Sequence, residues 1–298
     1  MLTLGIDTSN YATSLAVFDT DAGEVVCDCK KFLPVKEGQL GLRQSDALFH
    51  HTTALPAMLA ELGARADLTQ VRAVGVSARP RPVEGSYMPC FLAGVSAATA
   101  FSLSRALPLI ELTHQQGHIA AALYAAGDFT LFERESLVFH VSGGTTDLLL
   151  CHGAERITPL GTSSDLYAGQ AVDRLGVKLG FPFPAGVYVS EQAALCKEKV
   201  HPKVSVHGLT CSLSGLENQC AKLLADGHDA PYVCKYCLLC VGETLVRMRF
   251  LQRMIFRTFS TRREPFCFIL LSSLSVRCLR WWNLISLMRA CSVFCAAV

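Results

Sequence analysis

Two histidines, His114 and His118, lie four residues apart in the run His-Gln-Gln-Gly-His. If this run is helical, as the residues up to Ala126 indicate, both imidazoles lie on one face of the helix. Two imidazoles so placed can bind one divalent cation, although histidine pairs also occur on solvated helix faces. A zinc protease of the H-E-x-x-H type needs a glutamate after the first histidine, and position 115 is Gln. The pair therefore favours a metal site and disfavours a protease.

A polar turn, Ser142-Gly143-Gly144-Thr145-Thr146-Asp147, stands between two apolar runs, Leu137–Val141 and Leu148–Cys151. Paired glycines let a backbone approach a phosphate closely, and the N–H groups of such a turn can bind phosphate oxygens. The order of apolar strand, polar turn and apolar strand also occurs between Leu4 and Phe18. The repeat predicts either a nucleotide-binding site built from two hairpins or simply two ordinary hairpins with polar turns.

A third polar stretch, Gly161–Arg174, ends in a predicted helix whose small residues allow close packing. Asp173, near its end, is suited to accept hydrogen bonds from ribose hydroxyls, and it could equally be a carboxylate on a helix surface. A fourth stretch, Ser212–Leu216, is typical of a loop with a serine at the start of a helix.

Around these motifs the chain alternates strand and helix patterns, which predicts an α/β architecture. The expected strands are Leu2–Asp7, Thr13–Phe18, Val25–Phe32, Val71–Ser77, Leu109–Leu112, Leu137–Val141 and Leu148–Cys151. The expected helices are Ser45–Leu62, Phe91–Leu107, His114–Ala126 and Ala230–Met248.

The 298 residues are 51% hydrophobic and 17% charged, with a net charge of +2, so most of the chain is expected to fold into a sizeable core. We find no signal-peptide pattern and no apolar window long enough to span a membrane, and we expect a cytoplasmic protein.

Fourteen cysteines are scattered through the chain, many of them within apolar runs. Three of them, Cys234, Cys237 and Cys240, form a C-x-x-C-x-x-C run that could bind a metal or a cluster. No second cysteine pair stands at a suitable distance, so we favour reduced cysteines on one face of a helix that packs in the protein core.

The composition changes at Arg249. Residues 249–298 contain no Gly, Lys or Asp, but eight arginines, a single acidic residue, Glu264, and both tryptophans of the protein. An α/β protein needs glycine at its tight turns, and this composition is typical of a GC-rich gene read in a wrong frame. We expect a tail that neither completes the second lobe nor pairs with the Leu137–Cys151 hairpin; the alternative is a genuine helical tail.

The motifs, taken in order, resemble the catalytic subunit family of tRNA threonylcarbamoyladenosine synthase, formerly called the O-sialoglycoprotein endopeptidase or glycoprotease family. The resemblance covers residues 1 to 248 and rests on six matches: Gly5–Ser9, His114–His118, Val141–Thr146, Gly161–Arg174, Pro184–Gly186 and Cys211–Leu216.

The resemblance implies a two-lobed fold of the actin and Hsp70 ATPase type, with the first lobe over residues 1–130, the second over 131–248 and incomplete, and a non-family tail over 249–298. It implies transfer of a threonylcarbamoyl group from an adenylate to an adenosine of tRNA. His114 and His118 would bind a divalent metal, iron or zinc. The residues that would contact the adenylate or an ATP-type nucleotide are His140, Val141, Ser142, Gly143, Gly144, Asp173 and Gly186.

Six positions depart from the family pattern, and several of them lose an acidic group: Tyr11, Ala12, Gln116, Thr145, Gln170 and Glu217. Three functions therefore stay open. The first is the transferase or a diverged relative with another acceptor; the second is a non-catalytic nucleotide-binding subunit that binds a paralogous protein; the third and least favoured is a metalloprotease. The expected partners are tRNA, by the resemblance, and, for the second function, a paralogous subunit. No membrane is expected.

Overall fold

The protein is described by a computed structural model covering residues 1–9, 11–34, 42–127, 129, 133, 135–153, 156–259, 267–272 and 293–297; for Ala126 and from residue 249 onward it describes the backbone alone. The chain divides into two compact units, Met1–His118 and Ile119–Val298, which we call the first and second units. Their boundary falls inside helix α3 (His114–Ala126).

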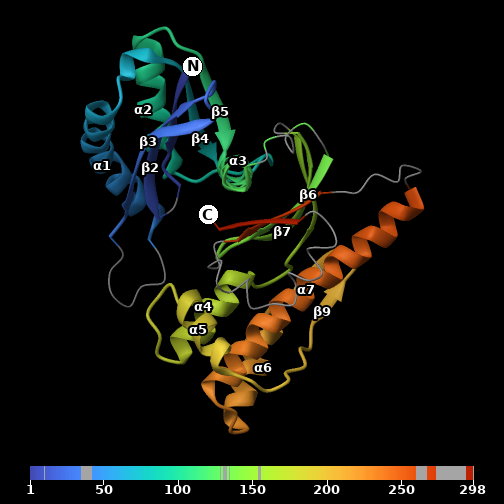
Figure 1. The fold of residues 1–298 in the computed structure, drawn as a ribbon. Helices are drawn as coiled ribbons and strands as arrows, with labels where there is room; N and C mark the ends of the chain where they lie inside the picture. The colour runs from blue at the N-terminus through green and yellow to red at the C-terminus, as the bar shows by residue number, and fades with distance from the viewer. Residues whose placement is uncertain are drawn as a thin grey trace. The chain divides into compact units, whose positions relative to one another are not determined.

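The first unit is built on a five-stranded sheet in the order β3-β2-β1-β4-β5 (Figure 1). Strands β1, β2 and β3 are antiparallel, whereas β4 and β5 run parallel to β1. The strands are β1 (Leu2–Asp7), β2 (Ala12–Asp19), β3 (Glu24–Phe32), β4 (Val71–Arg79) and β5 (Leu109–Thr113). A short 3-10 turn, η1 (Leu68–Gln70), precedes β4.

Alternating burial along β2 shows that one face of this sheet forms the core, as expected for strands that are half-buried. Helices α1 (Gln44–Arg65) and α2 (Phe91–Ser104) cover that face (Figure 1). Met58 and Leu62 of α1 pack in one cluster with Leu4 of β1. Burial of this apolar stripe, at about 25 cal/mol per Å², drives the packing of the helices on the sheet.

The second unit repeats the same sheet. Its order is β12-β11-β6-β7-β8, with β6, β7 and β8 antiparallel and β11 and β12 parallel to β6. The strands are β6 (Glu135–Val141), β7 (Thr146–His152), β8 (Arg156–Thr162), β11 (Cys267–Ser272) and β12 (Val293–Ala297). Read from the hairpin outward, both sheets have the order third, second, first, fourth, fifth, which confirms the internal repeat predicted from the two hairpins.

Both faces of the second sheet are covered, because successive residues of β6 are all buried from Ser136 onward. Leu137 and Phe139 pack in one cluster with helices α4 to α7, whereas Val138 packs with Ile119 and Leu123 of α3. The helices on the first face are α4 (Ala168–Lys178), α5 (Gly186–Leu195), α6 (Ser214–Ala225) and α7 (Ala230–Phe259). A two-stranded hairpin, β9 (Ser205–His207) and β10 (Thr210–Ser212), precedes α6.

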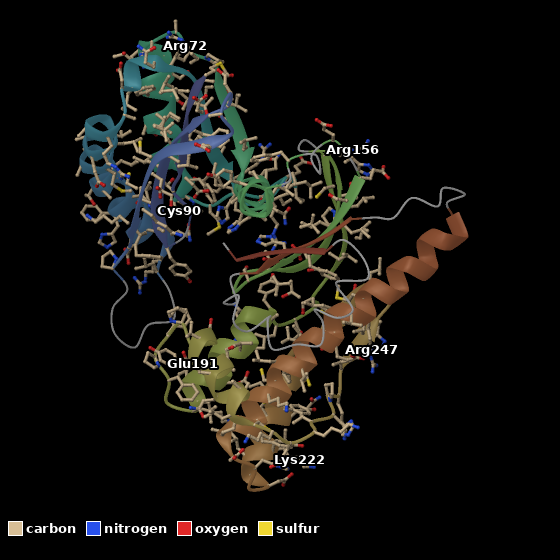
Figure 2. All side chains as sticks on the ribbon, viewed as in Figure 1. Arg72, Cys90, Arg156, Glu191, Lys222 and Arg247 are labelled. Atoms are coloured by element: carbon tan, nitrogen blue, oxygen red, sulfur yellow. The ribbon has the colours of Figure 1, made fainter. Side chains whose placement is uncertain are left out.

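The cysteine run lies in α7, the long helix that carries Arg247 (Figure 2). Cys234, Cys237 and Cys240 are buried in the core cluster of the second unit. Burial raises the pKa of Cys234 to about 12 and the pKa of Cys240 to about 11. Buried among apolar side chains, these thiols pack as small apolar residues of the core, as the sequence predicted.

The expectation that the tail would not pair with the Leu137–Cys151 hairpin is wrong. Residues Cys267–Ser272 pair in parallel with Ser136–Val141. The expectation rested on the lack of alternating polarity in the tail. Strands of parallel sheets are typically continuous apolar runs instead. Cys-Phe-Ile-Leu-Leu is such a run. No helix among the described residues is long and apolar enough to cross a membrane.

The position of β11 predicts strong protection of its backbone. Strand β11 lies between β6 and β12, whereas β12 is at the edge of the sheet. In hydrogen–deuterium exchange followed by mass spectrometry, amides of residues 267–272 should exchange more slowly than those of 293–297, because both sides of the inner strand are hydrogen-bonded. Exchange of 267–272 at the rate of unprotected amides would contradict this pairing.

Candidate functional site

Polar and titratable side chains of the first unit lie together where its three parallel strands end. Asp7 is the last residue of β1, Ser77 lies near the end of β4, and His114 directly follows β5. Ligand sites of open α/β sheets lie at the carboxyl ends of parallel strands. Ser77 Oγ donates a hydrogen bond to Asp7 Oδ2, and His114 Nδ1 lies 2.9 Å from the same oxygen.

The two predicted metal ligands are brought together at this edge. His114 is the first residue of α3 and His118 lies one turn later, with ring centroids 4.1 Å apart. Their Nε2 atoms are 2.6 Å apart, so one ring donates a hydrogen bond to the other. Both nitrogens therefore point to one place, as the spacing predicted.

Asp7 is held as a carboxylate beside His114. Burial by itself raises the pKa of Asp7, but the hydrogen bonds with His114, Ser77 and Ser9 outweigh it and hold the pKa well below its ordinary value. Ser9 N donates to Asp7 Oδ1 at 2.7 Å. No local pattern in the sequence gives Asp7 a role, because its partner His114 is 107 residues away in the chain.

A metal ion needs more ligands than these residues supply. Asp7 lies on the Nδ1 side of His114, away from the converging Nε2 atoms. Within the part of the chain that the structure describes, no group of three or more His, Cys, Asp or Glu residues could hold a metal ion. Zinc sites in proteins have three or four protein ligands. The pair fits the imidazole part of a metal site, and any further ligands would have to come from water, substrate or other parts of the chain.

In the second unit the Ser142-Gly143-Gly144-Thr145 turn joins β6 to β7. Ser142 N donates to Thr145 O at 2.8 Å, and Gly144 N donates to Ser142 Oγ at 3.1 Å. The two side chains of the turn also meet, with Ser142 Oγ 2.7 Å from Thr145 Oγ1. A Cβ atom built on Gly143 or Gly144 would have no neighbour within 4 Å, so the turn is open where a ligand would approach.

Helix α4 begins directly against this turn. Gly169 N donates to Ser142 O at 3.1 Å. A Cβ atom on Gly169 would lie only 2.5 Å from Gly143 N and 2.6 Å from Ser142 O, so a side chain at this position would displace the helix. The first two N–H groups of α4 are already bonded, since Ala168 N donates to Thr146 Oγ1 at 2.8 Å. What the start of the helix offers an anion is therefore the partial positive charge of the helix dipole.

Asp173 lies on the same face of α4, one turn after Gly169. Its Oδ1 accepts a hydrogen bond from Ala185 N at 2.8 Å, just before Gly186 begins α5. Burial raises the pKa of Asp173, an effect that hydrogen bonds from the Ala185 and Gly186 backbones oppose. The predicted ribose ligand therefore holds the start of α5, and through it Gly186 is tied to the same helix that packs against the glycine turn.

The other two predicted contacts, His140 and Val141, are the last two residues of β6. Both are buried, with 6% and 1% of their surface exposed. Their buried side chains end the strand directly before the turn.

Sequence analysis missed Asp165, a carboxylate that joins two motifs. Its oxygens accept hydrogen bonds from Ser212 Oγ and Ser214 Oγ, both at 2.6 Å, and from Leu213 N at 2.8 Å. Burial alone raises the pKa of Asp165, but these hydrogen bonds hold it well below its ordinary value. Asp165 thus fixes the loop before α6 to the loop after β8, a link across 47 residues.

Three departures from the family pattern have structural roles here. Gln116 Oε1 accepts from Thr113 N at 2.8 Å and from Thr113 Oγ1 at 2.9 Å, which caps the start of α3. Thr145 bonds Ser142 within the glycine turn. Glu217 pairs with Arg174 at 3.1 Å, linking α6 to α4 across the surface.

The duplicated sheets define the class of protein. Over 99% of this chain, the fold is similar to full-length HypF in the phosphate- and nucleotide-bound form, with a TM-score of 0.61, 10% identity and 44% of that chain covered. A ROK family protein from Streptococcus pneumoniae TIGR4 matches 100% of this chain and 92% of its own, with a TM-score of 0.50 and 12% identity. The fold is that of the actin- and Hsp70-like ATPases.

The family follows from the sequence comparisons. The model of the family described as "TsaD: tRNA N6-adenosine threonylcarbamoyltransferase" matches residues 36–249. Relatives of that name from Campylobacter concisus (strain 13826) and Onion yellows phytoplasma are 32% and 31% identical over 72% and 74% of this chain. The matches span 63% of the first relative and 93% of the second. This chain belongs to the tRNA N6-adenosine threonylcarbamoyltransferase family.

The contact between α4 and the glycine turn predicts that Gly169→Ala is destabilising. The added Cβ must push α4 from Ser142 and Gly143, and overpacking of this kind costs about 1–3 kcal/mol. Gly215 is the matched control, because it is also the second residue of a helix and a Cβ there would meet its nearest atom at 4.0 Å. Urea unfolding should show a loss for Gly169→Ala and no loss for Gly215→Ala; equal stability of both variants would contradict the close packing.

The lowered pKa of Asp165 predicts that the free energy of unfolding depends on pH. Its folded pKa lies below the ordinary value of about 3.9, so it stabilises the fold above that pH and loses this contribution as the pH falls. Asp165→Ala should cost about 1–2 kcal/mol at pH 7, less at pH 3, in thermal unfolding. Asp226→Ala, at the exposed end of α6, serves as control and should leave the stability unchanged at both pH 7 and pH 3. A loss for Asp165→Ala that is constant with pH would contradict the assignment.

Proposed function

We propose that this chain is a transferase that moves a threonylcarbamoyl group from an adenylate to an adenosine of tRNA. The observation that carries the proposal is the single face of α4, which has the open Gly143–Gly144 turn at its start and Asp173 with the start of α5 one turn later. The family supports the reaction. Because the chain spans about two thirds or less of several curated relatives, the activity of the whole enzyme is part of the proposal.

The adenylate is proposed to bind with its phosphate at the Ser142-Gly143-Gly144 turn. The open glycine turn lets a phosphate approach the backbone closely, and the partial positive charge at the start of α4 favours an anion there. The ribose and base then lie toward Asp173 and Gly186, and His140 and Val141 support the turn. The similar HypF structure is of a phosphate- and nucleotide-bound form, which supports a nucleotide as the ligand of this fold.

The reaction asks little covalent chemistry of the protein. The acyl group of the adenylate is part of a mixed anhydride and is already activated. The amine nitrogen of adenosine bonds to the acyl carbon, the bond from that carbon to the phosphate oxygen breaks, AMP leaves with this oxygen, and the amine gives up one proton to water. The residues of the second unit bind and orient the adenylate, which lowers the entropic part of the barrier. In the first unit, His114 and His118 would hold a divalent cation, iron or zinc; the chemistry that such a cation supplies when bound is stabilisation of charge on an oxygen atom.

A second candidate is a non-catalytic, nucleotide-binding subunit that binds a paralogous protein. It is favoured by the structural roles of Gln116 and Glu217, which form a helix cap and an ion pair at positions where the family has other charges. A metalloprotease has no support: the side chain of Gln116 caps α3, and position 115 is a buried Gln, so neither is a carboxylate base beside the histidines.

We also propose that the sequence of residues 249–298 is not that of the family, although β11 and β12 occupy the fourth and fifth places of the second sheet. The family match ends at residue 249, where glycine disappears from the sequence. The nucleotide sequence around codon 249 tests this: another frame should encode the Gly-Gly and Asn segment of the family, and the absence of such a segment in every frame would contradict the proposal.

Nucleotide binding predicts a thermal shift. Adenosine monophosphate at 100 times its Kd should stabilise the fold by about 2.7 kcal/mol, and Gly144→Val should abolish the shift because its side chain fills the space of the phosphate. A Cβ at Gly144 meets no atom of the protein, so the variant should fold. Gly215→Ala, which should keep the shift, is the control. A shift that persists in Gly144→Val would place the nucleotide elsewhere.

An assay of threonylcarbamoyl transfer distinguishes the transferase from the non-catalytic subunit. The purified chain, with threonylcarbamoyl adenylate and tRNA, should yield modified adenosine if it is a transferase, and His114→Ala should lower the yield by at least tenfold because the metal site is lost. The yield is measured by mass spectrometry of digested tRNA. Nucleotide binding without any transfer would support the non-catalytic subunit instead.

A further inference from the structure

Asp7 contacts His114 on the ring nitrogen that faces away from His118. His114 Nδ1 is 2.9 Å from Asp7 Oδ2, and His114 Nε2 is 2.6 Å from His118 Nε2. Ser9 N and Ser77 Oγ both donate to the carboxylate of Asp7, which is the acceptor of this group, so His114 Nδ1 is the donor in its contact with Asp7. A neutral imidazole with its proton on Nδ1 has its lone pair on Nε2, the nitrogen that converges with His118.

The carboxylate of Asp7 is itself fixed by two other segments. Ser77 Oγ, from β4, donates to Oδ2, and Ser9 N, from the turn after β1, donates to Oδ1. Because both oxygens are bonded, the carboxylate cannot rotate without losing a partner. The side chain of Asp7 is 26% exposed and that of His114 is 30% exposed, so the contact lies at the edge of the site rather than in the core.

The sheet keeps this arrangement in register. Strand β1 lies between β2 and β4, and β4 pairs with β5. Asp7, Ser77 and the residue before His114 therefore lie at or near the ends of three adjacent strands. Asp7 and His114 are separated by 107 residues in the chain. The order of the strands in the sheet, with β4 between β1 and β5, brings them close together.

We propose that Asp7 is a positioning residue that fixes the tautomer and orientation of His114 so that Nε2 faces a divalent cation. The proposal rests on the metal site of the proposed function. Carboxylates behind a metal-binding histidine raise its basicity and hold its ring, and their loss costs about 10–100-fold in metal affinity. Asp7 does not touch the cation or the substrate in this assignment; it acts through His114.

The first test uses Zn²⁺ alone with the full chain. The Kd is measured by competition with a chromogenic chelator for the wild type, Asp7→Asn, Asp7→Glu and the matched control Asp67→Asn. Asp67 is an exposed carboxylate of the same unit that hydrogen-bonds Thr69 beside η1. Asp7→Asn should weaken Zn²⁺ binding about 10–100-fold, Asp7→Glu should retain most of the affinity because it keeps a carboxylate, and Asp67→Asn should bind as the wild type does. Unchanged affinity in Asp7→Asn would overturn the proposal.

The second test reads the histidine directly and needs no metal. Nitrogen-15 NMR of the imidazole of His114 distinguishes the tautomer protonated at Nδ1 from the one protonated at Nε2. The wild type should show the Nδ1-protonated form, and Asp7→Asn should shift toward the other. If Asp7→Asn fails to fold, Ser77→Ala, which removes one hydrogen bond to Asp7, should show a smaller shift in the same direction. A tautomer unaffected by these changes contradicts the positioning role, and a wild type that binds no Zn²⁺ while His114 shows the predicted tautomer contradicts only the metal part of the proposed function.

Discussion

The second unit depends on the absence of a side chain at Gly169. Only a hydrogen atom at this position lets α4 begin against the backbone of Ser142 and Gly143. From that contact, Asp173 and Gly176 follow on the same helix face; Asp173 holds the start of α5, and Gly176 lies so close to Ala185 that a Cβ on it would be 2.2 Å from the Ala185 Cβ. One face of one helix therefore positions the glycine turn, the carboxylate and the next helix.

The first unit has a related contact at the corresponding hairpin. Thr8, in the turn after β1, donates to the carbonyl of Cys90 (Figure 2) and accepts from Gly94 N at 3.0 Å. A Cβ on Gly94 would lie 2.8 Å from Thr8 Oγ1, so a glycine again lets a helix approach a strand–turn–strand motif. The duplicated fold thus reuses one packing solution, whereas the chemistry differs: a histidine pair with a carboxylate in one unit, an open glycine turn in the other.

Local patterns predicted what local forces decide. Helical spacing was sufficient to place His114 and His118 together, and the hairpin pattern predicted the repeat of the two sheets. Contacts between distant segments left no such signal: Asp165 meets Ser212 across 47 residues, and Asp7 meets His114 across 107. The pairing of Cys267–Ser272 with β6 was missed for another reason, because a continuous apolar run does not reveal which strand it will join.

The central claim is that the face of α4 binds the adenylate, and the glycine amides report on it directly. In a chain labelled with nitrogen-15 at glycine only, which contains 22 glycines, adenosine monophosphate is titrated and the amide signals are followed by NMR. We expect the largest shifts on Gly143, Gly144 and Gly186. Saturable binding that leaves these three signals in place and moves glycines of the first unit, such as Gly94, would contradict it.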